Sequence, residues 1–207
     1  LNSFLHNTLK KSMSRYLSFD IGIKNLAYCL LEVDDSIEYR NIKILEWGVM
    51  DLARGQKVKE LNLMTIHSRM IESLNDCDFL NSNADIDTAI LENQPCLMNP
   101  TMKSVQILLF ASLWMRKEDG VIDIGQMAMF SARNKLEAYD GPEIDLSHIK
   151  TKYTRTKKLS IAYTKYMLEQ SDQSPEMKEL FENSKKKDDL ADAYLQGLTY
   201  IKKKVKI

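Results

Sequence analysis

The hydrophobic pattern of the chain opens with three apolar runs separated by short polar breaks, at residues 16–22, 26–33 and 41–52. These runs are rich in β-branched and aromatic residues, which favour strands, and the breaks between them are short enough to be turns. They therefore predict three consecutive strands that form an antiparallel meander. After them, apolar residues recur near helical spacing over residues 56–75, which predicts a helix that packs on the sheet.

The second half of the chain alternates between strand and helix patterns. Residues 87–92 (DTAILE) predict a short buried strand, an Asn-Pro pair opens a helix over residues 99–117, and residues 121–130 predict another strand. A strand–helix–strand unit of this length places its two strands parallel in one sheet. The remainder is expected to be mostly loop over residues 131–152, followed by helices at residues 156–169, 176–183 and 188–203.

The order of elements predicts an α/β fold with a mixed five-stranded sheet, first an antiparallel meander and then parallel strands, with helices on both faces. The chain has 207 residues, and we expect residues 13–207 to form a single domain. Residues 1–12 contain no acid, and we interpret them as a non-native or disordered extension before Met13. A targeting peptide is the alternative, because this stretch combines lysines with serines.

Composition limits the function classes. Hydrophobic residues make up 44% and charged residues 28% of the chain, which is typical of a globular protein, and no apolar run approaches a membrane span. The formal net charge is +0, so any affinity for nucleic acid must come from local basic patches. The three cysteines, Cys29, Cys77 and Cys96, form no CxxC pair. This favours reduced thiols in an intracellular protein over zinc or disulfides.

Two acidic residues are predicted at strand ends. Asp20 comes at the end of the first strand, two residues before Gly22, and Glu92 ends the fourth strand. A parallel neighbour of the first strand would present its last residue at the same edge of the sheet, where ligands of open α/β sheets bind. A buried carboxylate is costly without a compensating cation.

Further acids lie on the last predicted helix. Asp189 and Asp192 are three residues apart and therefore share a helix face. The alternative is that Asp188 caps the helix and the other acids are solvated. Together with Asp20 and Glu92, these residues would supply four hard oxygen ligands, which select Mg²⁺ or Mn²⁺. Two such ions could activate a water molecule and stabilise the leaving oxygen of a phosphodiester.

Two stretches without acids suggest interaction surfaces. Residues 146–168 combine six basic residues with three tyrosines, which suits a phosphate backbone and unstacked bases, although a solvated helix face has the same composition. The helix at residues 101–117 is too apolar for one buried stripe. It is either fully buried, or one of its faces pairs with a second copy of the chain.

Three motifs together resemble the RuvC-like Holliday junction resolvases, most closely the branch of poxviruses, other large DNA viruses and fungal mitochondria. They are FDIGIKNLA at residues 19–27, ENQP at residues 92–95 and KDDLADA at residues 187–193. The resemblance implies a ribonuclease H-like fold and a homodimer that resolves four-way DNA junctions by paired symmetric nicks with two Mg²⁺ ions per site. It also implies a viral replication site in host cytoplasm or nucleus, or the mitochondrion.

The resemblance carries residue roles with it. Asp20, Glu92, Asp189 and Asp192 become the metal-binding acids, with Asp20 bridging both ions and Glu92 beside the leaving oxygen. A lysine before the last helix stabilises charge on the phosphate: we expect Lys158, with Lys157 close behind and Lys135 as an outside candidate. The helix at residues 101–117 is the expected dimer contact. The residues expected to contact DNA are Lys24, Asn25, Gln94, Lys103, Lys135, Lys152, Arg155 and Lys157.

Other functions remain open from the residues alone. Asp20-Ile21-Gly22 also resembles the phosphate-binding turn of actin-like ATPases and sugar kinases, with Asp123-Ile124-Gly125 as a second turn, but seven glycines in 207 residues are few for such a protein. A ribonuclease H that acts on RNA–DNA hybrids would use the same four acids. A junction-binding protein without activity is the remaining alternative.

Overall fold

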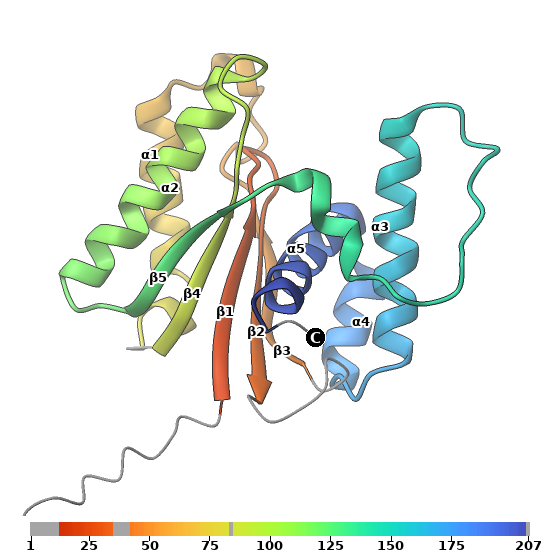
Figure 1. The fold of residues 1–207 in the computed structure, drawn as a ribbon. Helices are drawn as coiled ribbons and strands as arrows, with labels where there is room; N and C mark the ends of the chain where they lie inside the picture. The colour runs from red at the N-terminus through yellow and green to blue at the C-terminus, as the bar shows by residue number, and fades with distance from the viewer. Residues whose placement is uncertain (1–12, 35–41, 83–84, 206–207) are drawn as a thin grey trace, which may run out of the picture.

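The computed structural model describes residues 13–34, 42–82 and 85–205, and the predicted extension at residues 1–12 lies outside the described residues. The strands are β1 (Met13–Asp20), β2 (Leu26–Asp34), β3 (Lys43–Met50), β4 (Asp85–Glu92) and β5 (Asp123–Phe130). The helices are α1 (Leu63–Asn75), α2 (Pro100–Glu118), α3 (Lys152–Glu169), α4 (Pro175–Asn183) and α5 (Lys187–Val205) (Figure 1). None of the described helices is long and apolar enough to cross a membrane.

The five strands form one sheet in the order β3-β2-β1-β4-β5, which places β1 at its centre. β1 pairs antiparallel with β2 and parallel with β4, while β3 and β5 are the outermost strands. The predicted mixed sheet is therefore confirmed. In the parallel pair Phe19 lies opposite Leu91, so the next residues, Asp20 and Glu92, end neighbouring strands at the same edge of the sheet.

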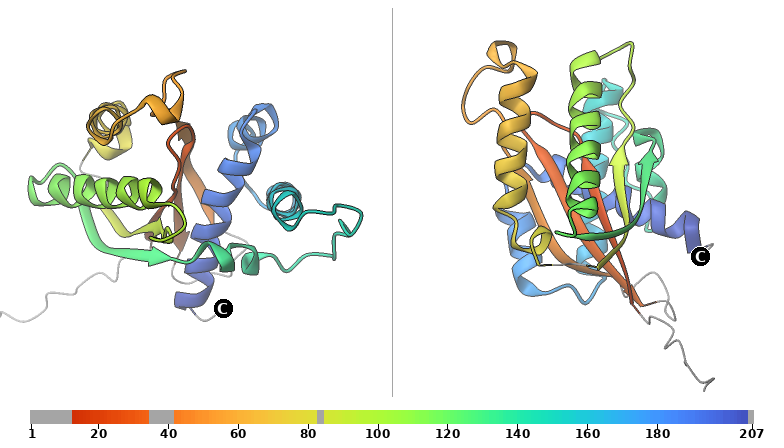
Figure 2. Two further views of the ribbon diagram at one scale, coloured as in Figure 1. Left: turned by 90° about the horizontal axis from the view of Figure 1, so that it is seen from above. Right: turned by 90° about the vertical axis from the view of Figure 1, so that its left-hand side faces the viewer.

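Each face of the sheet is covered by different helices. α1 and α2 lie on one face, and α5 lies across the other with α3 and α4 outside it (Figure 2). The alternation along β1 explains the two layers: Leu17 and Phe19 belong to the core under α1 and α2, whereas Tyr16 belongs to the core under α5. The prediction of helices on both faces is confirmed.

A glycine lets α5 lie close to the sheet. A Cβ atom at Gly197 would come 2.7 Å from Leu31 Cδ1 and 3.2 Å from the Cβ of Ser18 on β1. One residue earlier on α5, Gln196 Nε2 donates hydrogen bonds to Ser18 Oγ and to the carbonyl oxygen of Phe19, each at 3.0 Å. These contacts fix the position of α5 over the end of β1 that carries Asp20.

Helix starts are where the prediction and the structure differ. The helix predicted at residues 56–75 begins only at Leu63, because the Asn62 side chain accepts a hydrogen bond from the Thr65 N–H and so acts as its N-cap. Conversely, α3 begins four residues earlier than predicted, capped by Thr151. The stretch expected to be mostly loop also contains a 3-10 helix, η4 (Ala132–Ala138).

Candidate active site at the ends of β1 and β4

The acidic residues predicted from the sequence come together at one edge of the sheet. Asp20 and Glu92 end β1 and β4, and α5 brings Asp189 and Asp192 close enough for the charges of all three other acids to act on Asp20. Gly22 belongs to the turn that follows Asp20. A Cβ atom there would come 2.3 Å from the carbonyl oxygen of Asn25, so the turn requires glycine.

Burial makes the ionised form of both strand carboxyls, Asp20 and Glu92, unfavourable. Burial, and next the negative charge of Glu92, raise the pKa of Asp20 well above its ordinary value. Burial likewise raises the pKa of Glu92, although nearby Lys135 and the Ile21 N–H oppose the shift. Clustered acids with raised pKa values are typical of functional sites.

Lys135 on η4 lies within this group of acids. Its Nζ forms an ion pair with Asp192, and the two side chains are only 12% and 11% exposed. Burial lowers the pKa of Lys135, but the negative charges of Asp192, Asp20 and Glu92 outweigh burial, so the pKa is raised and the lysine stays cationic. Thr199 Oγ1 on α5 donates to the carbonyl oxygen of Lys135 at 2.9 Å and holds η4 in place.

Asp188 and Asp189 face different neighbours. Asp188 pairs with Lys157 of α3; burial raises the pKa of Asp188, but the hydrogen bond and charge of Lys157 outweigh it and lower that pKa. Asp189 belongs with the other acids, and burial followed by the charge of Asp188 raises its pKa. Asp188 lies inside the first turn of α5, which begins at Lys187, so it does not occupy the N-cap position that the alternative interpretation gave it.

The lysine beside the acids is therefore Lys135, the outside candidate. Lys158, the expected residue, is exposed on α3, and Lys157 is engaged with Asp188. The sequence signal for Lys135 was weak, because it lies in a stretch without periodic pattern. Its partner Asp192 is 57 residues away along the chain.

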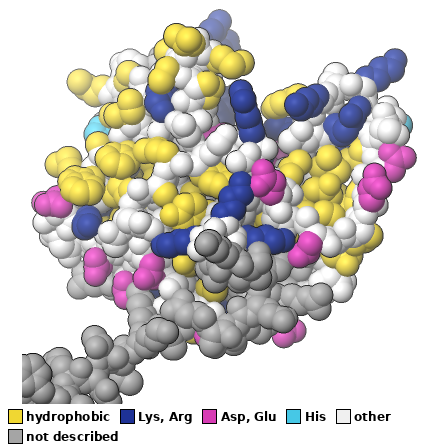
Figure 3. Space-filling view, viewed as in Figure 1, with side chains coloured by type: hydrophobic (Ala, Val, Ile, Leu, Met, Phe, Trp, Pro, Cys, Tyr) yellow, Lys and Arg dark blue, Asp and Glu magenta, His cyan; other side chains and the backbone are white. Residues whose placement is uncertain are grey.

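The expected DNA contacts are scattered around this site. Lys24 and Lys152 are exposed. The guanidinium of Arg155 instead donates to the carbonyl oxygen of Ile149 at 2.7 Å. Figure 3 shows a hollow between the α1–α2 side and the α3 side of the molecule, with Lys and Arg side chains along it.

Gln94, another expected DNA contact, is turned toward the acids. Its Nε2 donates to Glu92 Oε2 at 2.6 Å, and its backbone N–H donates to the side chain of Gln106 at 2.8 Å. Gln106 was not among the residues predicted from the sequence. The available signal was a lone amide in the apolar run VQILLF of α2, a helix that contributes the buried residues Val105 and Leu109 to the core.

The donor set suits a divalent cation. Asp192 Oδ1 is buried and has no hydrogen-bond partner among the described residues, and carboxylate oxygens are the ligands that Mg²⁺ prefers. Within the described ranges, however, no three Asp, Glu, His or Cys side chains already converge on one ion position. Since Lys135 lies among the acids, a cation that binds there has to compete with its ammonium group.

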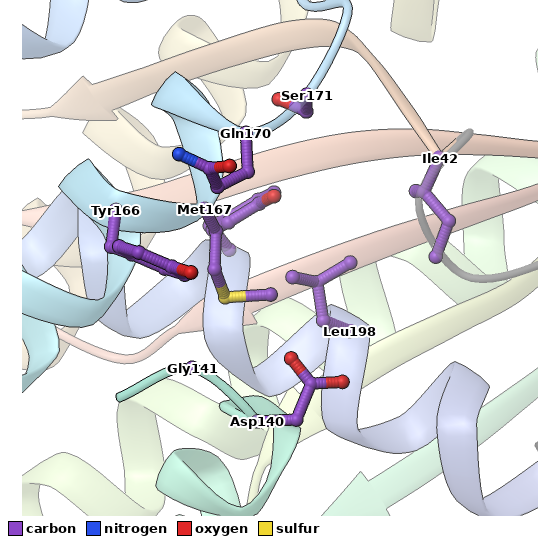
Figure 4. A pocket seen from close by; sticks show the side chains of 9 residues that line it. Ile42, Asp140, Gly141, Tyr166, Met167, Gln170, Ser171 and Leu198 are labelled. Carbon is purple, nitrogen blue, oxygen red and sulfur yellow. The ribbon is translucent and has the colours of Figure 1, made fainter. Parts of the chain in front are cut away.

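The described residues also form a pocket of about 290 Å³ between α3 and the C-terminal half of α5. Figure 4 shows Tyr166 and Met167 extending from α3, with Gln170 just after its end, opposite Leu198 of α5 and Asp140. None of the four acids lines this pocket, so it is separate from the candidate active site.

The second turn expected of an ATPase is not formed. Asp123, Ile124 and Gly125 lie in β5, where they begin the strand. β5 runs parallel to β4, which runs parallel to β1, so Asp123 starts its strand at the edge opposite to Asp20. Two phosphate-binding turns cannot face one ligand from opposite edges of the sheet.

Comparisons with known proteins place this geometry on a known fold. No protein-family profile matches the chain. It is 37% identical over 123 residues to the uncharacterized protein L451 of Acanthamoeba polyphaga mimivirus. That match covers 56% of this chain but only 29% of the mimivirus protein, so the chain corresponds to less than a third of this relative.

Solved structures of similar fold are Holliday junction resolvases. The yeast mitochondrial resolvase Ydc2 has a TM-score of 0.55 at 16% identity, over 93% of this chain and 80% of Ydc2. The fowlpox virus resolvase, solved with its substrate junction, has a TM-score of 0.55 at 17% identity, over 91% and 97% of the two chains. Thermus thermophilus RuvC with a junction substrate has a TM-score of 0.50 at 13% identity, over 90% and 92%. The chain therefore has the ribonuclease H-like fold of the RuvC-like resolvases.

Proposed function

We propose that this protein is a structure-selective DNA endonuclease that resolves four-way junctions by paired nicks and depends on divalent cations. One observation carries the proposal: Asp20, Glu92, Asp189 and Asp192 gather at one edge of the sheet, around a buried lysine, on a fold that junction resolvases share. Each acid comes from an element that this fold positions, so the cluster follows from the fold.

The four acids would hold two Mg²⁺ ions, with Mn²⁺ able to substitute, because both ions take hard oxygen ligands. When bound, such ions supply Lewis-acid stabilisation of charge on the phosphate and lower the pKa of an attacking water. Lys135 would add a fixed positive charge beside the scissile phosphate, the role expected for Lys158. This assignment follows from the ion pair of Lys135 with Asp192 and from the exposure of Lys158.

DNA would occupy the hollow between the α1–α2 side and α3. Lys152 and Lys158 on α3 provide positive charge on one side, and Lys24 lies in the β1–β2 turn. On the other side, the loop at residues 93–99 exposes Leu97 and Met98 almost fully. Apolar side chains in such a position can pack against bases that a branch point leaves unstacked.

A homodimer through α2 would place two active sites on one junction. Ile107, Trp114 and Met115 of this helix are between 45% and 63% exposed, and a two-fold pair of sites matches two symmetric cuts. Substitution of Met115 by glutamate should then convert a dimer to a monomer in sedimentation experiments. The matched control is Leu180→Glu, which alters an exposed apolar residue on α4.

Cleavage of a synthetic four-way junction, with Mg²⁺ or with EDTA, tests the proposal beside matched linear duplex and RNA–DNA hybrid. We expect Mg²⁺-dependent, symmetric cuts in opposing strands of the junction alone. Cleavage of the hybrid alone would make the protein a ribonuclease H with the same four acids. Tight junction binding without any cleavage would identify a binding protein and overturn the proposal.

A further inference from the structure

Two hydrogen bonds to a single oxygen, Oε2, orient the carboxyl group of Glu92. Gln94 Nε2 donates to Glu92 Oε2 at 2.6 Å, and the backbone N–H of Ile21 donates to the same oxygen at 3.2 Å. Both donors are neutral and both come from the chain segments that border the acids. Because they converge on Oε2, they fix the plane of the carboxyl group and leave Oε1 outside these two bonds.

Gln94 is itself held by a buried residue of α2. The Gln94 backbone N–H donates to Gln106 Oε1 at 2.8 Å, and Gln106 is only 2% exposed. The same oxygen accepts a hydrogen bond from Lys103 Nζ at 3.1 Å, while Gln106 Nε2 lies 3.0 Å from Met129 Sδ as a donor. A buried amide is costly unless it is satisfied, and here both ends of it are used.

The loop at residues 93–99 is anchored at Asn93, the residue before Gln94. The Asn93 N–H donates to the carbonyl oxygen of Phe130 at 2.7 Å, and Lys103 Nζ donates to Asn93 Oδ1 at 3.0 Å. Gln106 therefore completes a chain of contacts that runs from the interior of α2 through Gln94 to the carboxyl of Glu92.

We propose that Gln94 and Gln106 are positioning residues that present Glu92 to a divalent cation through one oxygen, Oε1. The proposal rests on the proposed function, since it assumes that Glu92 is a cation ligand. The two positions have opposite hydrogen-bonding requirements. Residue 94 must donate a hydrogen bond to Glu92, whereas residue 106 must accept one from the Gln94 backbone.

Substitutions at Gln94 and Gln106 can test these two requirements separately. Gln106→Glu keeps the acceptor and can pair with Lys103, whereas Gln106→Leu removes the acceptor at similar volume. Gln94→Leu removes the donor at similar volume. Loss of a residue that hydrogen-bonds to a metal ligand typically weakens metal affinity about 10–100-fold. We expect that loss for Gln106→Leu and Gln94→Leu, and near wild-type affinity for Gln106→Glu.

Two readouts avoid any dependence on cleavage. Titration of Mn²⁺ or Mg²⁺ against thermal stability gives the cation affinity of each variant. Hydrogen exchange of the Gln94 amide in EDTA should show protection in wild type and Gln106→Glu, and its loss in Gln106→Leu. The matched control is Gln126→Leu, because Gln126 also donates to a neighbour, Thr88 Oγ1 at 2.9 Å, but lies away from the acids.

The outcomes separate this inference from the proposed function. Wild-type cation affinity in folded Gln94→Leu, or an equal loss in Gln106→Glu and Gln106→Leu, would overturn the positioning role. If Gln106→Leu does not fold, the substitution Gln94→Leu at a half-buried position still decides. Unchanged cation affinity in Glu92→Gln would instead show that Glu92 is no ligand, and the proposed function would fail with it.

Discussion

The acids at the strand ends and the acids on α5 are held in opposite ways. Glu92, at the end of a strand, is oriented by neutral donors, the Ile21 N–H and Gln94 Nε2. The α5 segment is held by lysines, with Lys135 at Asp192 and Lys157 at Asp188. A neutral donor can stay in place when a cation binds, whereas an ammonium group competes with that cation for the same carboxylate. The strand side is therefore preorganised, and the helix side has to exchange one positive charge for another.

The largest effect is expected from the strand side. Asp20→Asn should lower junction cleavage by at least about 10²–10³-fold, the scale for losing one preorganised charge-stabilising group. Junction binding in EDTA should persist, because the change removes a negative charge near the phosphates. Single-turnover cleavage and a binding titration would be measured together. Loss of both activities at once would count against a catalytic role for Asp20.

Substitution of Lys135 removes its ion pair with Asp192 of α5. Lys135→Met leaves Asp192 buried without its cation, and breaking a buried pair typically costs about 3–5 kcal/mol of unfolding free energy. Mg²⁺ should recover much of this loss, because another cation then neutralises the acids. Urea unfolding in EDTA and in Mg²⁺ measures both values. Equal stability of wild type and variant in EDTA would show that the ion pair contributes little.

The stability of the metal-free protein should depend on pH through the acids at the strand ends. Burial and Glu92 raise the pKa of Asp20 in the folded protein, while the unfolded carboxyl titrates near 3.8. Between these two pKa values the folded state holds the extra proton, so stability falls as pH rises across that interval. Thermal unfolding in EDTA should show this decline in wild type and a smaller one in Asp20→Asn. An identical pH profile in both proteins would contradict it.

The smallest effects are expected on α3. Lys157→Met should lower the unfolding free energy by about 0.2–1 kcal/mol, since its pair with Asp188 is partly exposed. The adjacent control, Lys158→Met, should leave stability unchanged because Lys158 is exposed. Both should weaken junction binding and its salt dependence. If Lys158→Met abolished cleavage while binding persisted, Lys158 rather than Lys135 would supply the catalytic charge.

Local sequence patterns were sufficient to predict the elements that carry the acids. Strand patterns ending at Asp20 and Glu92 are local signals, and parallel pairing then brings the two ends to one edge of the sheet. The three-residue spacing of Asp189 and Asp192 is also local, because helix geometry alone places them on one face. The fold class and the four candidate acids were therefore predictable.

The neighbours of these acids depend on packing between elements that are distant in the sequence. α5 approaches the sheet closely at Gly197, and in this position the charge of Asp189 acts on Asp20 while Asp188 pairs with Lys157. Lys135 reaches Asp192 from a 3-10 helix with no periodic pattern. Gln106 acts through a loop that contacts it across the packed face of α2. Each of these contacts joins separate elements, and packing, rather than local sequence preference, brings such elements together.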